Sequence, residues 1–281
     1  MKKIKNNILI IFLIIFIAIF ICIKITGNKE TSHLPSYVND VTVNEDFFQS
    51  MNEKELTVYK ILNSIDFFKT AIGTYKYVDS SDNCNEIVKY YVDIDNKKSY
   101  VNTQSEDGEV NKELICTENS KIYFDNIKRV YSEFPVSKTI EIDYIRKLKP
   151  EDRYDKKSNE FISRQDGNFM VEVSEILFNQ ELQSYLKDYE KWNIQGEEDY
   201  LNRKAIYITG SLGFTSKNGS NKFELLVDKS TGIVLKLNFL NKDNKIISSL
   251  ITTDIILDKT IESSIFEKGT SGYNKNSSGE E

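Results

Sequence analysis

Residues 222–266 read KFELLVDKSTGIVLKLNFLNKDNKIISSLITTDIILDKTIESSIF and decide the architecture of this chain. Apolar and polar side chains alternate along three runs, which are 223–227, 233–239 and 247–257. Turn-forming segments separate them, DKSTG at 228–232 and NKDNK at 241–245. Alternation with a period of two, interrupted by Gly, Asn and Asp, predicts three consecutive antiparallel strands with one buried face. The pattern indicates a fold and carries no catalytic chemistry.

Outward from this stretch, a helix followed by strands is predicted twice. Apolar residues at helical spacing predict helices over 44–70 and 174–191, with Ser174 as the N-cap of the second. Alternating segments predict further strands at 72–78, 87–94, 99–103, 110–117, 121–125, 129–132, 169–173 and 203–210. The fold class is therefore α+β, with one large antiparallel sheet and helices over one of its faces.

The N-terminus carries a segment suited to a membrane. Lys2, Lys3 and Lys5 precede an unbroken apolar run over 8–23. Such a run rises about 24 Å at about 1.5 Å per residue, and flanking lysines that snorkel extend it toward the ~30 Å hydrocarbon core. We expect an uncleaved signal anchor in the cell membrane that crosses once, with a cytoplasmic N-terminus and an extracytoplasmic domain. A cleaved signal peptide is the alternative, although the small residues of a cleavage site are missing.

Composition then divides the chain into four parts. Residues 1–27 form the cytoplasmic stub and transmembrane signal anchor, and residues 28–44 a polar tether. Residues 45–267 form the extracytoplasmic domain. Residues 268–281 are rich in Gly, Ser, Asn and Glu and are predicted to be a disordered tail.

The sequence lacks the residues that several classes of function require. The net charge of −6 has no basic stripe, which excludes a nucleic-acid partner. His33 is the only histidine and lies in the tether, so no histidine-based triad or zinc site is expected in the domain. Phosphate-binding glycine motifs are absent from the sequence, and the acidic run 197–199 reads as a solvated loop. We therefore expect a protein that is not an enzyme and that holds no metal ion or cofactor.

The cysteines leave one question open. Cys22 falls in the apolar run, while Cys84 and Cys116 fall in the domain. In an oxidising compartment the latter two can form a disulfide across strands, or they can remain two separate thiols.

A family resemblance rests on residues of the second half. The segment WNIQGEEDYLNRKAIYITG at 192–210, the stretch FELLVDKSTGIVLKL and the closing strand resemble the lipoprotein-carrier (LolA-like, RseB-like) superfamily. Within this superfamily, the sequence resembles membrane-anchored members from Gram-positive bacteria, of the sporulation and sigma-factor-regulator types. The run EIVKYYVDIDNKKSYV at 86–101 matches more loosely. The matching signature residues are Trp192, Arg203, Gly210, Asp228, Thr231, Gly232 and Phe266.

The resemblance implies a strongly curved antiparallel sheet, a half-barrel, with helices on its concave face. It also implies an apolar space for an acyl chain, a lipid or a lipoprotein. We therefore expect a non-enzymatic, membrane-anchored protein that binds an apolar ligand or a lipidated partner in envelope sensing or lipoprotein handling. The alternative is a protein-interaction module that regulates a membrane partner in a sigma-factor or sporulation system. The ligand-contacting residues cannot be assigned, because the register of the strands is not visible in the sequence.

Overall fold

The computed structural model describes residues 45–81, 84–105, 107–136, 143–213 and 219–276. The chain divides into two units, Met1–Ser36 and Tyr37–Glu281, and every described residue belongs to the second. No helix among these residues is long and apolar enough to cross a membrane. The apolar run 8–23, the cytoplasmic stub and the tether lie outside the described residues, so the membrane anchor stays a prediction.

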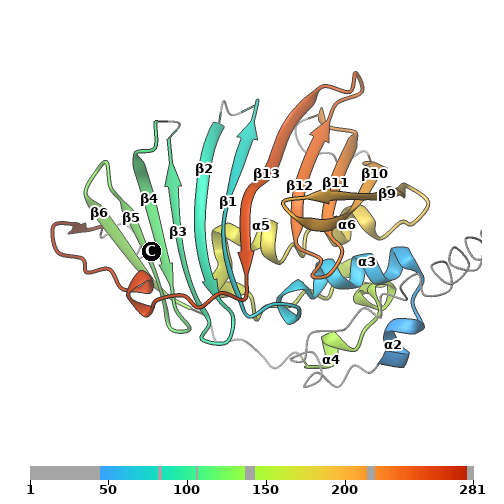
Figure 1. Ribbon diagram of the computed structural model, residues 1–281, viewed down its shortest axis with the longest axis horizontal. Coiled ribbons are helices and arrows are strands. Elements are labelled where there is room, and N and C mark those ends of the chain that lie inside the picture. The colour runs from blue at the N-terminus through green and yellow to red at the C-terminus, as the bar shows by residue number, and fades with distance from the viewer. Residues whose placement is uncertain (1–44, 82–83, 106, 137–142, 214–218, 277–281) are drawn as a thin grey trace, which may run out of the picture. The chain divides into compact units, whose positions relative to one another are not determined.

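One sheet organises the second unit. Within the described residues, twelve strands pair in the order β14-β6-β5-β4-β3-β2-β1-β13-β12-β11-β10-β9 (Figure 1). Their bounds are Thr70–Asp79 (β1), Cys84–Asp93 (β2), Lys98–Gln104 (β3), Val110–Cys116 (β4), Ser120–Asp125 (β5), Val130–Pro135 (β6), Trp192–Tyr200 (β9), Arg203–Ser211 (β10), Lys222–Asp228 (β11), Val234–Leu240 (β12), Ile246–Leu257 (β13) and Asn274–Lys275 (β14). All neighbours run antiparallel except β14 beside β6, which makes the sheet mixed and open. Tyr154–Asp155 (β7) and Glu160–Phe161 (β8) form a separate pair.

Short helices and 3₁₀ turns pack against both faces of this sheet, with the turn Ser263–Phe266 on the face opposite the others that contact it. Their bounds are Glu45–Gln49 (α2), Glu53–Leu62 (α3), Asp143–Arg146 (α4), Ser174–Leu177 (α5) and Leu182–Leu186 (α6), with 3₁₀ turns Ser64–Asp66 (η2), Pro150–Arg153 (η3), Asn168–Val173 (η4) and Ser263–Phe266 (η6). Tyr75 Oη donates to the Glu172 carbonyl at 2.8 Å, and Ser99 Oγ donates to that of Phe169 at 2.5 Å. We call the face that holds Tyr75 and Ser99 the inner face. The core lies between this face and the helices.

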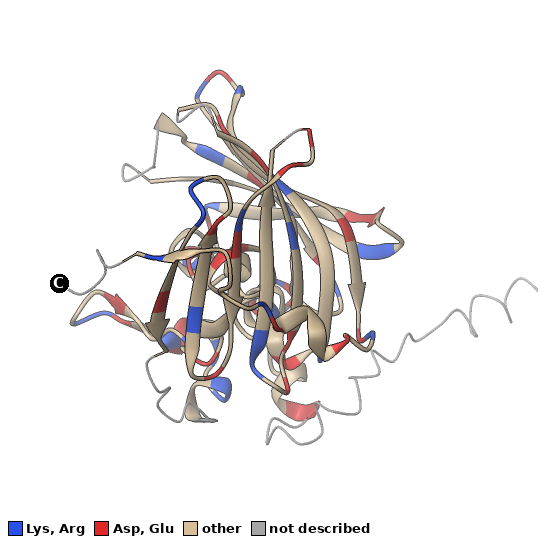
Figure 2. Ribbon diagram, turned by 90° about the vertical axis from the view of Figure 1, so that its left-hand side faces the viewer, with Lys and Arg blue, Asp and Glu red and all other residues tan. Residues whose placement is uncertain are grey.

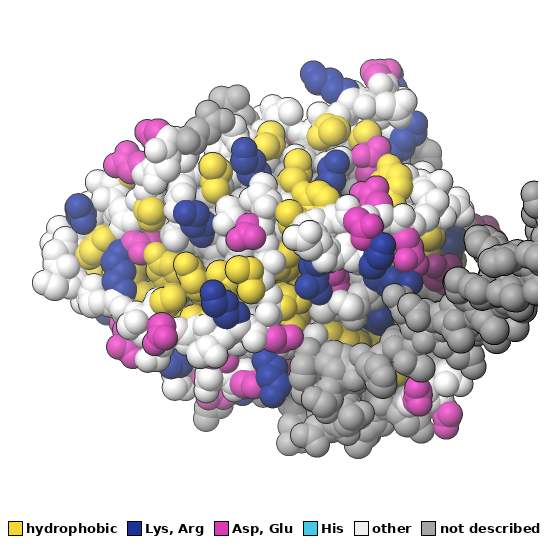
Figure 3. All heavy atoms as spheres, in the orientation of Figure 1, with side chains coloured by type: hydrophobic (Ala, Val, Ile, Leu, Met, Phe, Trp, Pro, Cys, Tyr) yellow, Lys and Arg dark blue, Asp and Glu magenta, His cyan; other side chains and the backbone are white. Residues whose placement is uncertain are grey.

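The outer face carries the end of the chain. Tyr273 packs edge-on against Phe124 with ring centroids 5.0 Å apart, and its hydroxyl donates to Asn126 Oδ1 at 2.6 Å. Lys268 pairs with Glu113, and β14 then extends the edge of β6. The structure thus differs from the disordered tail that composition predicts, because Lys268 and Tyr273 bind this face; 277–281 lie outside the described residues. Figure 3 shows this face, where charges of both signs interrupt the apolar side chains. Lys, Arg, Asp and Glu are also interspersed along the strands in Figure 2.

The first predicted helix is shorter than its apolar spacing indicates. Asn52 and Glu55 form a capping box, with the Glu55 N–H donating to Asn52 Oδ1 at 3.1 Å and the Asn52 N–H donating to Glu55 Oε2 at 2.8 Å. At the other end, Asn63 Nδ2 donates to the Tyr59 carbonyl at 2.8 Å. These two asparagines set the bounds of α3 within the predicted range 44–70.

The second predicted helix, 174–191, is wrong as one continuous element. It breaks at Phe178, whose backbone angles are φ −153° and ψ 60°. Asn179 caps both sides of the break, since its Nδ2 donates to the Glu175 carbonyl at 2.8 Å and its Oδ1 accepts from the Leu182 N–H at 3.0 Å. Ser174 is not an N-cap, because its hydroxyl donates backward to the Val171 carbonyl at 3.0 Å.

The strand predictions of the meander are confirmed, whereas one other strand prediction and one loop prediction are wrong. Leu237 pairs with Leu225 on one side and with Leu250 on the other, as the alternation of 222–266 requires. The segment 169–173, predicted as a strand, is the 3₁₀ helix η4. The acidic segment 197–199 belongs to strand β9 at the edge of the sheet, where pairing on one side leaves its side chains exposed.

Cys84 and Cys116 form no disulfide. Cys116 lies beside Ser99, and Ser99 lies beside Val92, which is eight positions beyond Cys84 on the same strand. At about 3.3 Å per residue this offset corresponds to about 26 Å. A disulfide needs Cα atoms within about 7 Å, so the register rules out the pairing that the sequence left open.

Candidate ligand pocket between the sheet and the helices

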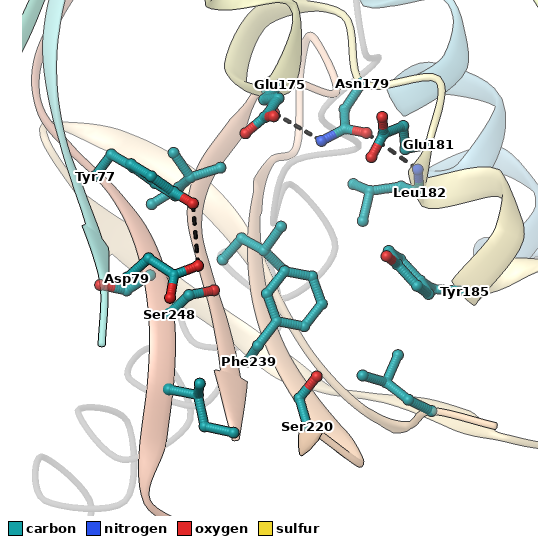
Figure 4. A pocket seen from close by; sticks show the side chains of 15 residues that line it. Tyr77, Asp79, Glu175, Asn179, Glu181, Leu182, Tyr185, Ser220, Phe239 and Ser248 are labelled. Carbon is teal, nitrogen blue, oxygen red and sulfur yellow. Dashed lines mark hydrogen bonds between the residues drawn. The ribbon is translucent and has the colours of Figure 1, made fainter. Parts of the chain in front are cut away.

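A pocket opens between the inner face of β1, β12 and β13 and the helices α5 and α6 (Figure 4). The empty space between its side chains measures about 740 Å³, solvent at the mouth included. Its apolar floor consists of Leu182, Leu212, Leu237, Phe239 and Leu250. The part of this space that the centre of a water molecule can occupy is much smaller, about 80 Å³.

Residue size along the meander explains why the space exists. Phe239 on β12 stands opposite Ser248 on β13, and Ser248 in turn stands opposite Asp79 on β1. The small Ser248 side chain therefore leaves room beside the Phe239 ring. From the helix side, the Tyr185 ring meets the Phe239 ring edge-on at 5.7 Å between centroids. Helix α6 is thereby held above the sheet with the gap between them preserved.

One part of the rim is a hydrogen-bonded carboxylate on β1. Tyr77 Oη donates to Asp79 Oδ2 at 3.2 Å, as Figure 4 shows. The other oxygen of Asp79 accepts from the Ser81 N–H at 2.8 Å and from its hydroxyl at 2.6 Å. Burial and the neighbouring Asp79 raise the pKa of Tyr77 to about 12, so this phenol is neutral and acts as a donor.

The opposite rim comes from the break between α5 and α6. Glu175, Asn179 and Glu181 line the pocket there, and Asn179 is held by its two backbone hydrogen bonds. Among the lining residues that the structure describes, there is no histidine or cysteine for nucleophilic or acid–base chemistry. The described residues also hold no group of three or more His, Cys, Asp or Glu side chains placed to bind a metal ion. An apolar floor with a polar rim suits the binding of an amphiphile.

Four of the signature residues lie together at the β11–β12 turn, away from this pocket. Asp228 Oδ1 accepts from the Thr231 N–H at 2.8 Å and from its hydroxyl at 2.8 Å, and Arg203 donates to Oδ2. Gly232 has φ +81°, a left-handed conformation that favours glycine. A Cβ at Gly232 would lie 2.2 Å from the carbonyl carbon of Lys60 in α3. The turn thus fixes α3 against the sheet.

The remaining signature residues also pack the fold. Trp192 is fully buried, its Nε1 donates to the Leu186 carbonyl at 3.0 Å, and the Lys54 ammonium lies 4.7 Å from the ring centroid. A Cβ at Gly210 would lie 2.4 Å from the Phe223 ring, so glycine permits this close approach. Phe266 is buried in η6, whose contacts are with β3. None of the seven signature residues, all of them described, lines the pocket.

A buried ionic cluster was missed by the sequence analysis. The Arg164 side chain is fully buried and donates to both oxygens of Asp66, at 2.6 and 3.0 Å, and to both of Asp166, at 3.1 and 2.6 Å. Burial disfavours its charge, yet the two carboxylates outweigh that effect and raise the pKa of Arg164. Arg146 pairs with the same Asp66 at 3.2 Å. The cluster joins η2 to the segment 143–166.

The Asp228–Arg203 pair predicts a dependence of stability on acid. Burial opposes ionisation of Asp228, but hydrogen bonds from Arg203, Ser230 and Thr231 outweigh burial and hold the pKa of its carboxyl below the ordinary value. A depressed native pKa stabilises the fold above the unfolded-state pKa of about 3.9, and this stabilisation is lost as pH falls through the native pKa. We expect Asp228→Asn to lower the free energy of unfolding by about 2 kcal/mol at neutral pH and to flatten the loss below about pH 4.

Urea unfolding at several pH values measures this difference. Asp199→Asn is the control, since Asp199 forms an exposed pair with Lys204 at 2.9 Å and is expected to change stability by less than about 1 kcal/mol. Parallel pH curves for Asp228→Asn and the unmodified chain would contradict the assignment.

No family model matches this sequence, and no curated protein matches it. Solved structures are similar in fold. The MucA/MucB complex of Pseudomonas aeruginosa has a TM-score of 0.45 and 12% identity, over 78% of this chain and 62% of that chain, so this chain spans less than two thirds of it. Lipoprotein LppX of Mycobacterium tuberculosis has a TM-score of 0.41 and 8% identity, over 74% and 97%. A LolA superfamily protein of Nitrosomonas europaea has a TM-score of 0.26 and 13% identity, over 74% and 96%.

Proposed function

We propose that this chain is a non-enzymatic binding protein that holds the apolar part of an amphiphilic ligand in the pocket between β1, β12 and β13 and the helices α5 and α6. The ligand is an acyl chain that belongs either to a lipid or to a lipidated partner protein. One observation carries the proposal: beside the packed core, a local cavity with an apolar floor opens between β1, β12 and β13 and the helices α5 and α6.

The floor supplies the binding energy in this account. Phe239, Leu212 and Tyr185 are half-buried and present apolar surface that a hydrocarbon chain would cover, and each methylene removed from water contributes about 0.8 kcal/mol. The rim keeps contact with solvent, so the polar end of the ligand remains hydrated. The pocket therefore suits a ligand with two chemically distinct ends.

The predicted membrane anchor gives this activity its setting. Lys2, Lys3 and Lys5 followed by the apolar run 8–23 favour a domain tethered on the outer side of the cell membrane. A tethered domain cannot carry a ligand across a compartment. We therefore propose that it senses an envelope component, or transfers a lipid or lipidated partner locally.

Filling the pocket tests this function. Tyr37–Glu281 forms a compact unit that holds the described core, so we expect it to fold on its own, and a cooperative thermal transition checks this first. Ser248→Trp places an indole beside Phe239 and is expected to raise the Kd for dodecyl maltoside at least about tenfold, measured by titration calorimetry below the critical micelle concentration.

Lys76→Trp is the matched control. Lys76 lies on β1 of the same sheet, exposed on the outer face, so an indole there leaves the pocket unchanged. Equal affinity of all three proteins for dodecyl maltoside would place binding elsewhere and contradict the proposal. Failure of the unmodified unit to bind dodecyl chains of any kind would contradict it altogether.

A further inference from the structure

The charges at the pocket rim are of one sign among the described lining residues. Asp79 approaches from β1, while Glu175 and Glu181 approach from the α5–α6 break on the other side of the opening (Figure 4). The same set of described residues contains no lysine, arginine or histidine. The polar end of a bound amphiphile would therefore lie among carboxylates.

Three hydrogen-bond donors surround the carboxyl group of Asp79. Its two oxygens accept from Tyr77 Oη, the Ser81 N–H and the Ser81 hydroxyl, all of which are donors that favour a carboxylate. Asp79 is buried, with only 3% of its surface exposed, so solvent screens its charge weakly. Glu181 is exposed and lies where a headgroup leaves the pocket.

An anionic headgroup at this rim would be repelled and would also lose part of its hydration. A cationic headgroup is attracted by the same field, and an ammonium group can donate to the carboxylate oxygens. A neutral headgroup experiences neither effect. The sign of the rim charge therefore discriminates between ligands that share one apolar chain.

We infer that the pocket selects amphiphiles whose polar end carries a primary ammonium over those that end in a carboxylate. The inference rests on the proposed function, because it concerns the same pocket and adds the chemical class of its ligand. The apolar floor supplies affinity without regard to headgroup, and the carboxylate rim supplies the selectivity.

Three ligands with one dodecyl chain test it. Titration calorimetry of the unit Tyr37–Glu281 with dodecylammonium, dodecyl maltoside and dodecanoate near neutral pH is expected to give that order of affinity. The Kd for dodecylammonium should be lower than that for dodecanoate by about tenfold or more at low salt. About 0.5 M salt should reduce the ratio, because it screens the exposed part of the rim.

Two substitutions separate rim from floor. Glu175→Gln combined with Glu181→Gln removes two charges while keeping side-chain size, and is expected to reduce the ratio to within about threefold. Dodecyl maltoside should bind this variant as before, which shows that the fold and the floor are intact. Glu198→Gln removes an exposed charge of β9 outside the pocket and is expected to leave the ratio unchanged.

The outcomes distinguish the two proposals. If none of the three ligands binds, the proposed function itself fails. If all bind equally, or dodecanoate binds most tightly, the function stands and the inference about the ammonium group is overturned. If dodecylammonium binds most tightly, the affinities for lysophosphatidylethanolamine and for the methyl ester of S-dodecylcysteine compare two sources of an ammonium group. Tighter binding of either than of dodecanoate supports the inference, and the tighter of the two identifies a lipid headgroup or a lipidated amino acid.

Discussion

Arg164→Met is expected to lower the free energy of unfolding by about 3–5 kcal/mol. The Arg164 side chain is fully buried, and it neutralises Asp66 and Asp166 through short hydrogen bonds. Methionine fills much of the same volume but, among the described residues, leaves Asp66 and Asp166 with only the partly exposed Arg146 as a counter-charge. Removing one partner of a buried ionic cluster lowers stability strongly, because it leaves a buried charge without compensation. Replacing the whole cluster with apolar residues changes stability far less. Urea unfolding followed by circular dichroism measures the change.

A double substitution shows whether charge or packing causes the loss. Arg164→Met combined with Asp66→Asn removes the cation together with one of its carboxylates. The double variant should therefore lose less stability than the summed losses of the two single variants, by more than about 1 kcal/mol. Lys156→Met is the exposed control and is expected to change stability by less than about 0.5 kcal/mol. Strict additivity of the two substitutions would contradict the ionic account.

Gly232→Ala is expected to lower the free energy of unfolding by about 3 kcal/mol. Gly232 has φ +81°, which a side chain disfavours, and its new Cβ would lie 2.2 Å from the Lys60 carbonyl carbon. Because that atom belongs to the backbone of α3, the helix itself must move away from the sheet. Thermal and urea unfolding of the variant measure the combined cost of conformation and contact.

Gly108→Ala isolates the conformational part of that cost. Gly108 has φ +85°, nearly the same as Gly232, but no heavy atom lies within 4 Å of the position of an added Cβ. The expected loss is therefore about 1 kcal/mol. If both alanine variants lose the same stability, the close approach of the β11–β12 turn to α3 contributes nothing.

The strands of the second half were predictable because their signal is local. Alternation over 222–266 fixes which side chains share a face, and the turns at 228–232 and 241–245 fix the connections. The helices were less predictable, since the apolar spacing of 174–191 continues past the point where Asn179 interrupts the chain. The burial of Arg164 was unpredictable, because a charged residue in a polar segment does not indicate that it pairs with Asp66, which lies far away in the sequence.

The pocket depends on features that the sequence does not display. Its space exists because Ser248 stands opposite Phe239, and this pairing requires the register of β12 and β13. Its second wall requires the position of α5 and α6 over the sheet, which follows from tertiary packing. The signature residues gave no guide to it, since those at the β11–β12 turn stabilise the fold. A resemblance carried by such residues predicts architecture better than binding.

The most direct test of the central claim is native mass spectrometry of the unit Tyr37–Glu281, purified from the cell envelope of its own host. The account predicts an additional mass that corresponds to a bound amphiphile, released as the collision energy rises. Ser248→Trp should lose this mass, whereas Lys76→Trp should keep it. An unliganded mass for all three proteins, or a bound amphiphile that survives Ser248→Trp, would contradict the claim that the pocket beside Phe239 holds an apolar ligand.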